Sequence, residues 1–203
     1  MAYNVISLED MREALGEAKL KSILNEFECE LNKDVEYFIK EKAIEFLKSG
    51  ISKTFLVTAS YKGKQVLVGY FSLTNKVTKV KKTSLSSNWR KRIARFENKY
   101  ESDDKNYIIS LPLIGQLGKN YKDNYNRLIS GDVLLKLACD KVKEAQKILG
   151  GKLVYLECED KPQLEEFYTS NGFVCFGKRN LERDEREKNN GEYLLQMLCF
   201  LGD

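Results

Sequence analysis

The chain has 203 residues, of which 42% are hydrophobic and 32% are charged, and its formal net charge is +4. This length and composition suffice for one substantial hydrophobic core, so we expect a single α/β domain over residues 1–203. The sequence contains no histidine. Its absence excludes a Ser-His-Asp or Cys-His nucleophilic site, a histidine-containing zinc site and an imidazole general base, and we expect no metal centre.

The cysteines are odd in number and no two have the spacing of a CxxC pair: Cys29, Cys139, Cys158, Cys175 and Cys199. We expect reduced thiols that pack as small apolar residues, as in a cytoplasmic protein. No signal sequence opens the chain, and no apolar run approaches the roughly 20 residues that cross a membrane. The expected location is therefore the cytoplasm, without membrane contact.

Two amphipathic helices are predicted near the start of the chain, over residues 8–25 and 34–47. In the second, apolar residues recur at three- and four-residue spacing, Asp34 lies in the first turn, and Gly50 ends the helix. Two β-rich runs follow, over 54–60 and 65–73. The Lys-Gly-Lys turn between them indicates a β-hairpin.

A basic segment comes next, from Lys76 to Arg95, with eight lysines or arginines and no acid. A helix is predicted over about residues 87–100. Two interpretations stay open: a solvated loop and helix face, or a phosphate-binding surface. Trp89 and Phe96 are interleaved with the basic residues, a combination that suits a phosphate backbone and unstacked bases.

The second half begins with an apolar run over 107–117 and a polar loop closed by Ser130-Gly131. A strongly amphipathic helix follows and ends at Gly150-Gly151. A strand over 153–157, a helix over 163–170 and strands over 174–178 and 193–201 complete the set, with a charged hairpin loop over 183–190. A strand–loop–helix unit aims the loop amides and the helix N-terminus at one point, which is a natural seat for a pyrophosphate.

The order of these pieces resembles the GNAT acetyltransferase superfamily, and within it the acetyltransferase toxins of bacterial toxin–antitoxin systems. The resemblance spans roughly residues 27–178. It rests on an ordered series of short segments: Phe27-Glu28-Cys29, Val35, Tyr37-Phe38, Ala43, residues 52–57, residues 68–73, residues 117–120, Gly131 and residues 168–173. It implies the GNAT fold, a mixed and mostly antiparallel sheet with a splayed central strand pair, flanked by helices. It also implies acetyl-CoA as the cosubstrate.

The resemblance implies two cofactor-binding segments. At the end of the central strand, the main chain around Leu117, Gly118 and Lys119 would hold the pantetheine arm and the acetyl carbonyl, where an amide donor stabilises developing negative charge. The pyrophosphate loop corresponds to residues 126–131. Asn126 and Ile129 depart from the family pattern there. The expected contacts in this loop are Arg127, Leu128, Ile129, Ser130 and Gly131.

Tyr168 corresponds to the family tyrosine that protonates the departing thiolate of coenzyme A. A phenol suits this role, because a thiolate of pKa near 8.5 accepts a proton from a nearby hydroxyl. A buried core tyrosine is the alternative. Glu157, Glu159 and Asp160 end a strand beside the expected site, but a base is unnecessary if the acceptor is an amine already partly neutral at pH 7.

The first functional hypothesis is an acetyl-CoA-dependent N-acetyltransferase that works by direct attack of a primary amine. The resemblance and the basic segment favour aminoacyl-tRNA as acceptor, bound by Arg90, Lys91, Arg92 and Arg95. A small amine or a protein amine is the alternative acceptor. A GNAT-fold binding module without catalysis and a simple nucleic-acid-binding protein are the other hypotheses. A cognate antitoxin and a homodimer are partners that the sequence leaves open.

Overall fold

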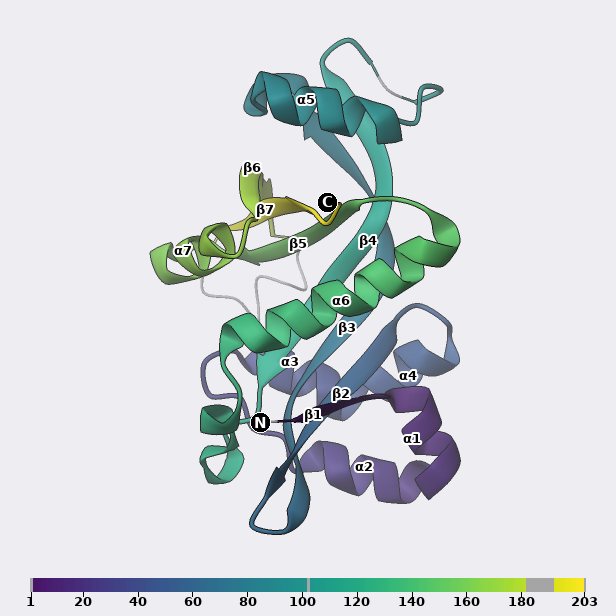
Figure 1. Cartoon of the computed structure of the whole chain (residues 1–203), viewed down its shortest axis with the longest axis vertical. Helices are drawn as coiled ribbons and strands as arrows, with labels where there is room; N and C mark the ends of the chain where they lie inside the picture. The colour runs from purple at the N-terminus through teal and green to yellow at the C-terminus, as the bar shows by residue number, and fades with distance from the viewer. Residues whose placement is uncertain (1, 102, 182–191, 203) are drawn as a thin grey trace. The chain divides into compact units, whose positions relative to one another are not determined.

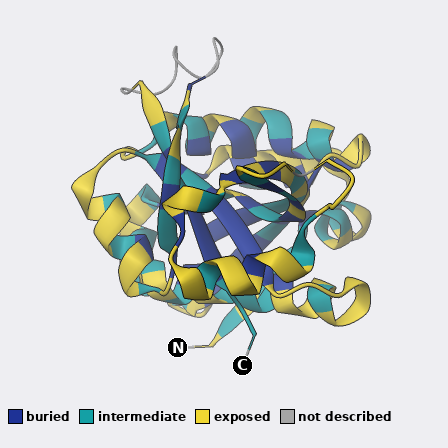
Figure 2. Cartoon of the chain, turned by 90° about the horizontal axis from the view of Figure 1, so that it is seen from above, coloured by how far each residue is buried: buried dark blue, intermediate teal, exposed yellow. Residues whose placement is uncertain are grey.

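The computed structural model describes residues 2–101, 103–181 and 192–202. Within them the strands form one seven-stranded sheet, in the order β1-β2-β3-β4-β5-β7-β6 (Figure 1). The chain divides by its contacts into two compact units, which we call unit 1 (Met1–Thr74 and Ile114–Lys141) and unit 2 (Asn75–Leu113 and Val142–Asp203). Buried residues concentrate on the strands, and the helices carry exposed residues along their outer sides (Figure 2).

Unit 1 begins with a strand that the sequence did not lead us to expect. β1 (Tyr3–Ser7) pairs antiparallel with β2 (Lys53–Tyr61). The helix predicted over 8–25 is two helices, α1 (Leu8–Leu15) and α2 (Glu17–Asn25). The break lies at Gly16, whose φ of 78° and ψ of 156° are not helical and are open to a residue without Cβ.

The second predicted helix is confirmed over almost its whole length. It starts as α3 (Lys33–Tyr37) behind an Asn32 cap, passes through a π-helical turn (Phe38–Lys42) and continues as α4 (Ala43–Lys48). The predicted hairpin is also confirmed: β2 pairs antiparallel with β3 (Lys64–Lys81). Lys62 and Gly63 both have positive φ, as the favoured two-residue hairpin turn requires. β3 runs beyond the predicted strand and includes the start of the basic segment.

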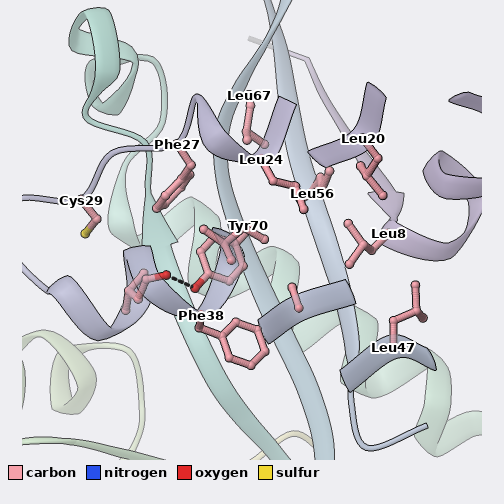
Figure 3. Close-up of a cluster of buried hydrophobic side chains, with 13 residues drawn as sticks. Leu8, Leu20, Leu24, Phe27, Cys29, Phe38, Leu47, Leu56, Leu67 and Tyr70 are labelled. Atoms are coloured by element: carbon pink, nitrogen blue, oxygen red, sulfur yellow. Dashed lines mark hydrogen bonds between the residues drawn. The ribbon is translucent and has the colours of Figure 1, made fainter. Parts of the chain in front are cut away.

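Helices cover both faces of the unit 1 strands. Leu56 on β2 lies opposite Tyr70 on β3, and both belong to a core cluster with α1, α2, α3 and α4 (Figure 3). The Tyr70 hydroxyl donates to the Val35 carbonyl oxygen at 2.6 Å. Neighbouring residues of a strand point to opposite faces, so Gly69 faces the other side, where Leu134 of α6 (Gly131–Leu149) lies against it.

Unit 2 contains the far ends of β3 and β4 (Asn106–Lys119) and the remaining strands. These are β5 (Leu153–Glu159), β6 (Val174–Asn180) and β7 (Tyr193–Phe200), with β7 antiparallel to both of its neighbours. The strands and helix predicted for this region are confirmed, including α7 (Pro162–Ser170). The predicted hairpin loop over 183–190 lies outside the described residues.

The helix predicted over 87–100 is shorter than expected. α5 (Ser87–Ile93) is followed by a 3-10 turn (Ala94–Phe96), and the chain is not helical from Glu97. Another 3-10 turn, Lys82–Ser84, separates α5 from β3. The apolar side of α5 packs through Ile93 into a second core cluster with residues of β4, β5 and β7. Trp89, one turn before Ile93, and Phe96 in the following turn are partly buried against the same cluster.

Side-chain alternation gives the unit 2 strands two different faces. Tyr155 lies opposite Leu198, and both belong to the core cluster beneath α5. Cys158 on β5 lies three residues from Tyr155 and therefore points to the other face. That face carries α7, which packs against β5 and places Tyr168 near Cys158.

Candidate active site

The end of β4 is clamped at Gly118 in unit 1. A Cβ built on Gly118 would lie 2.3 Å from Cγ1 of Val35 on α3, and a Cβ on Gly69 would lie 2.9 Å from the Gly118 carbonyl oxygen. The backbone of this strand end therefore lies against α3 on one side and β3 beside it. Leu117 and Lys119, the predicted main-chain contacts, flank this fixed point.

Substitution of Gly118 by alanine should lower the free energy of unfolding by about 1–3 kcal/mol, because the new methyl group overlaps Val35. Urea unfolding measures the change. Val35→Ala removes the overlapping methyl groups, so the double variant should be less destabilised than the sum of the two single variants. Strict additivity of the two changes would contradict this contact.

Asn120 is a structural residue of the site for which we predicted no separate role. It is 1% exposed, and both the oxygen and the nitrogen of its amide group make hydrogen bonds. Its Nδ2 donates to the Leu67 carbonyl oxygen at 2.9 Å, and its Oδ1 accepts from the backbone N–H of Glu28 at 3.0 Å and of Lys122 at 3.1 Å. Asn120 thereby fixes where the chain leaves β4 and enters the loop.

The loop after β4 is a 3-10 segment, Lys122–Leu128, interrupted by a kink. Asp123 and Asn124 have φ values of 49° and 60°, in the left-handed region that Asp and Asn tolerate best among non-glycine residues. Two side chains anchor the loop. Lys119 Nζ donates to the Asn126 carbonyl oxygen at 3.2 Å, and the Tyr3 hydroxyl donates to that of Leu128 at 2.8 Å.

The loop ends in three consecutive backbone N–H groups, those of Ile129, Ser130 and Gly131. Among the described residues no group accepts a hydrogen bond from any of them. Ser130 caps α6, since its Oγ accepts from the Val133 N–H at 3.2 Å. Free amides at the N-terminus of a long helix favour an anion through their donors and through the helix dipole.

Ile129 departs from the family loop pattern, and the structure gives the reason why this is tolerated. The residue is 2% exposed, so its side chain lies in the core, and no described group accepts a hydrogen bond from its amide. Arg127 is exposed and has no carboxylate partner within the described part of the chain. The loop therefore offers amides and one cation together, all within unit 1.

Tyr168 lies near the end of α7 in unit 2. The residue is 9% exposed, and the rings of Phe167 and Phe173 contact it edge-on, with centroids at 4.9 and 5.8 Å. Burial raises the pKa of Tyr168 well above its usual value, and the nearby Cys158 adds to the effect. The phenol therefore stays protonated at neutral pH, as a proton donor must.

The Tyr168 hydroxyl has no hydrogen-bond partner among the described residues. No fully buried side-chain oxygen or nitrogen in the described chain lacks a partner, so the small exposed part of Tyr168 includes its hydroxyl. Tyr155, a buried tyrosine on β5, differs: its hydroxyl contacts Glu157 and accepts from Gln196 at 2.9 Å.

The candidate bases are all engaged in ion pairs. Glu157 accepts from Arg179 Nε at 2.9 Å and Nη2 at 2.7 Å, and from Lys76 Nζ at 3.1 Å. Burial raises the pKa of Glu157, but the hydrogen bonds from Arg179 and Tyr155 and the charge of Lys76 outweigh it and keep this pKa below its usual value. Glu157 also points to the face of β5 opposite Cys158 and Tyr168.

Glu159 and Asp160 are no better placed to take a proton. Lys161 Nζ lies 2.8 Å from Glu159, and Lys178 pairs with Asp160. The site therefore offers a proton donor, Tyr168, without an unpaired acid from the end of β5 to act as base.

Solved structures with a similar fold cover nearly the whole chain. AtaT complexed with acetyl-methionyl-tRNAfMet has a TM-score of 0.61 and 15% identity, over 96% of this chain and 94% of that chain. A tyrosine-to-phenylalanine mutant of KacT gives 0.61 and 15%, over 97% and 94%. AtaTR bound with AcCoA gives 0.57 and 16%, over 96% and 92%. The chain shares the fold of AtaT and KacT.

This likeness, and the mostly antiparallel sheet flanked by helices, confirm the predicted fold class. No protein-family model matches the sequence, and no curated protein matches it. No helix among the described residues is long and apolar enough to span a membrane. All five cysteines are free thiols, and the described side chains contain no group of three or more acids or cysteines that could hold a metal ion.

The basic segment is only partly balanced by acids. Lys76 pairs with Glu157, and two further lysines have weaker acidic partners: Lys79 with Asp103 and Lys82 with Glu97, both at 3.7 Å. The four residues predicted to bind the acceptor are exposed, and none has a carboxylate partner among the described residues: Arg90, Lys91, Arg92 and Arg95. The charge left over is thus on α5 and the turn that follows it, together with the exposed Lys81 at the end of β3.

The predicted site residues fall into two groups. Unit 1 brings together the end of β4 and the loop before α6, joined by the hydrogen bond from Lys119 to Asn126. Unit 2 holds Tyr168 and the basic residues of α5, on opposite faces of its strands.

Proposed function

We propose that this chain is an acetyl-CoA-dependent N-acetyltransferase whose acceptor is the amino group of aminoacyl-tRNA. The observation that carries the proposal is the row of free amides at Ile129, Ser130 and Gly131, at the N-terminus of α6, in the fold of AtaT and KacT. These amides and Arg127 would hold the diphosphate of the cosubstrate. The main chain at Leu117 and Lys119 would hold its pantetheine arm and polarise its thioester carbonyl.

The reaction that these groups support is direct acyl transfer. The lone pair of the acceptor nitrogen forms a bond to the thioester carbonyl carbon, and the carbon–sulfur bond breaks. The thiolate takes a proton from the Tyr168 hydroxyl, and the nitrogen loses a proton to water. An α-amino group beside an ester is partly neutral at pH 7, so the paired state of Glu157 is no obstacle.

Two observations favour charged tRNA over a small amine. Arg90, Lys91 and Arg95 are exposed cations without acidic partners in the described chain. They lie on α5 and the turn after it, whose other side packs into the core. A small amine needs no such surface, whereas a phosphate backbone does. AtaT, which shares the fold, has been solved with acetyl-methionyl-tRNAfMet.

The alternative hypothesis, a binding module without catalysis, rests on the departures of the loop before α6 from the family pattern. The buried Ile129 side chain and the free amides around it remove that basis, because the amides serve an anion whatever side chain they carry. The module predicts either no acetyl-CoA binding or binding without turnover on any amine.

The test is transfer of a labelled acetyl group from acetyl-CoA to a pool of aminoacyl-tRNAs at several salt concentrations. Arg90→Gln, Lys91→Gln and Arg95→Gln combined should weaken the apparent tRNA affinity and flatten its salt dependence, with a slope change of about 2–3. Lys42→Gln, Lys48→Gln and Lys53→Gln combined remove the same charge from lysines already paired with acids, and should change little. Turnover that does not respond to salt or to the α5 variant contradicts the tRNA acceptor.

A further inference from the structure

A small cluster at the end of β7 combines two unpaired cations with one aromatic ring. The Arg92 guanidinium carbon lies 4.8 Å from the centroid of the Phe200 ring, and Lys152 Nζ lies 6.0 Å from the same centroid. Arg92 and Lys152 are exposed, and within the described residues neither has a carboxylate partner. We call these three residues the Phe200 cluster; all of them belong to unit 2.

The backbone holds this cluster in place. Phe200 lies opposite Leu153 in the β5–β7 ladder, and beyond the ladder the Leu201 N–H donates to the Lys152 carbonyl oxygen at 2.7 Å. A Cβ at Gly202 would lie 2.6 Å from Lys152 Cδ and 2.6 Å from Phe200 Cε1, so this glycine leaves room for the lysine stem beside the ring. The ring itself packs on the core cluster beneath α5.

A guanidinium that lies on an aromatic ring is pre-organised for binding an anion. Stacking engages the flat face of the group, and its N–H donors remain in the plane and point outward. Arg92 therefore gives up little side-chain freedom on binding a phosphate, to which it can donate two parallel hydrogen bonds. Lys152 adds a second point charge at the same ring. No acid in the described chain competes for either charge.

We propose that the Phe200 cluster is a binding site for the phosphate backbone of RNA. It extends the basic surface of α5 to the ends of β5 and β7. Trp89 and Phe96, which are partly buried beside the same core cluster, place further aromatic rings along this surface, and rings with interleaved cations suit RNA better than an acidic protein segment. The proposal rests on the proposed function only in naming tRNA as the RNA.

The experiment measures binding of uncharged, labelled tRNA by fluorescence anisotropy over a range of salt concentrations, without acetyl-CoA. Arg92→Gln with Lys152→Gln should reduce the slope of log affinity against log salt by about 1.4–1.8. If the two lines meet near 1 M salt, this corresponds to roughly 20-fold weaker binding at about 0.15 M. Lys42→Gln with Lys48→Gln is the control of equal charge, and should leave the slope unchanged.

Two further variants separate pre-organisation from charge. Phe200→Leu keeps both cations and removes the ring, and Arg92→Lys keeps the charge and loses the planar donor edge. Both should bind tRNA several-fold more weakly than the parent, with a smaller slope change than the double variant. Thermal melting checks that each variant is folded. If Phe200→Leu does not fold, Arg92→Lys alone tests pre-organisation.

An unchanged slope in the double variant, or an equal loss in the control, would overturn the proposal. So would a double variant that keeps tRNA affinity and loses binding of labelled poly-glutamate, which would assign the cluster to an acidic protein segment. Because the assay uses uncharged tRNA, it is independent of catalysis. If the parent binds tRNA through the cluster but acetylates no amine, the proposed function is wrong and the RNA-binding proposal stands.

Discussion

Tyr168→Phe is expected to lower kcat by roughly 10²- to 10⁴-fold, the usual contribution of a positioned general acid. The substitution removes one hydroxyl that makes no hydrogen bond to any described residue, so the packing of the ring against Phe167 and Phe173 should be retained. Acetyl-CoA affinity, measured by isothermal titration, should stay within a few-fold of the parent. The loss should therefore appear in turnover and not in binding.

The pH profile gives a second measurement of the same residue. Because burial raises the pKa of Tyr168, the acid should stay protonated, and turnover of the parent should not fall through its ionisation below about pH 10. A fall in rate at high pH that disappears in Tyr168→Phe, with its midpoint near pH 8, would contradict the buried position.

Tyr155→Phe is the matched control, since this tyrosine is also buried in unit 2 but its hydroxyl is already bonded to Glu157 and Gln196. We expect turnover within a few-fold of the parent and a loss of about 1–2 kcal/mol in the free energy of unfolding. Equal turnover losses in the two variants would mean that the effect comes from packing, and would remove Tyr168 from the role of acid.

Gly131→Pro should weaken acetyl-CoA binding by roughly 10- to 100-fold, because it deletes one of the three free amides at the start of α6. A hydrogen bond to a charged group contributes about 1.5–3 kcal/mol. Proline is well tolerated at the first position of a helix, where its missing N–H has no intrahelical partner, so α6 should still form.

Gly131→Ala is the control, because it adds a side chain at the same position and keeps the amide. Isothermal titration with acetyl-CoA and circular dichroism of each variant separate ligand binding from helix content. The affinity of Gly131→Ala for acetyl-CoA should be close to that of the parent, and the affinity of Gly131→Pro should be far lower. If both variants bind alike, the amide of Gly131 does not hold the diphosphate, whatever its place at the helix terminus.

The parts of the fold that could be predicted are those whose signal lies within one element. The apolar stripe of α6 and the β2–β3 hairpin follow from periodicity and turn residues, and both are confirmed. The break at Gly16 was missed, because a single glycine inside an amphipathic pattern is compatible with either one helix or two. β1 was missed because its partner, β2, lies fifty residues further along the chain.

The sequence supports a hypothesis for the candidate site but not the contacts that build it. The resemblance located Gly118, Gly131 and Tyr168, but a sequence gives no means of seeing that Asn120 bonds to three separate backbone groups. Likewise, the run from Lys76 to Arg95 contains no acid in sequence, and only the fold brings Glu157 to Lys76. Long-range pairing of this kind depends on the tertiary structure and leaves no local pattern.

The inward turn of Ile129 has a consequence for how such proteins are found. An anion-binding site made of main-chain amides depends on the backbone conformation. Any residue that allows this conformation can occupy such a position. Few residue types are then required by the ligand itself, so sequence divergence can remove the motif while the backbone geometry is retained. Structure comparison therefore detects a chain like this one after sequence comparison no longer does.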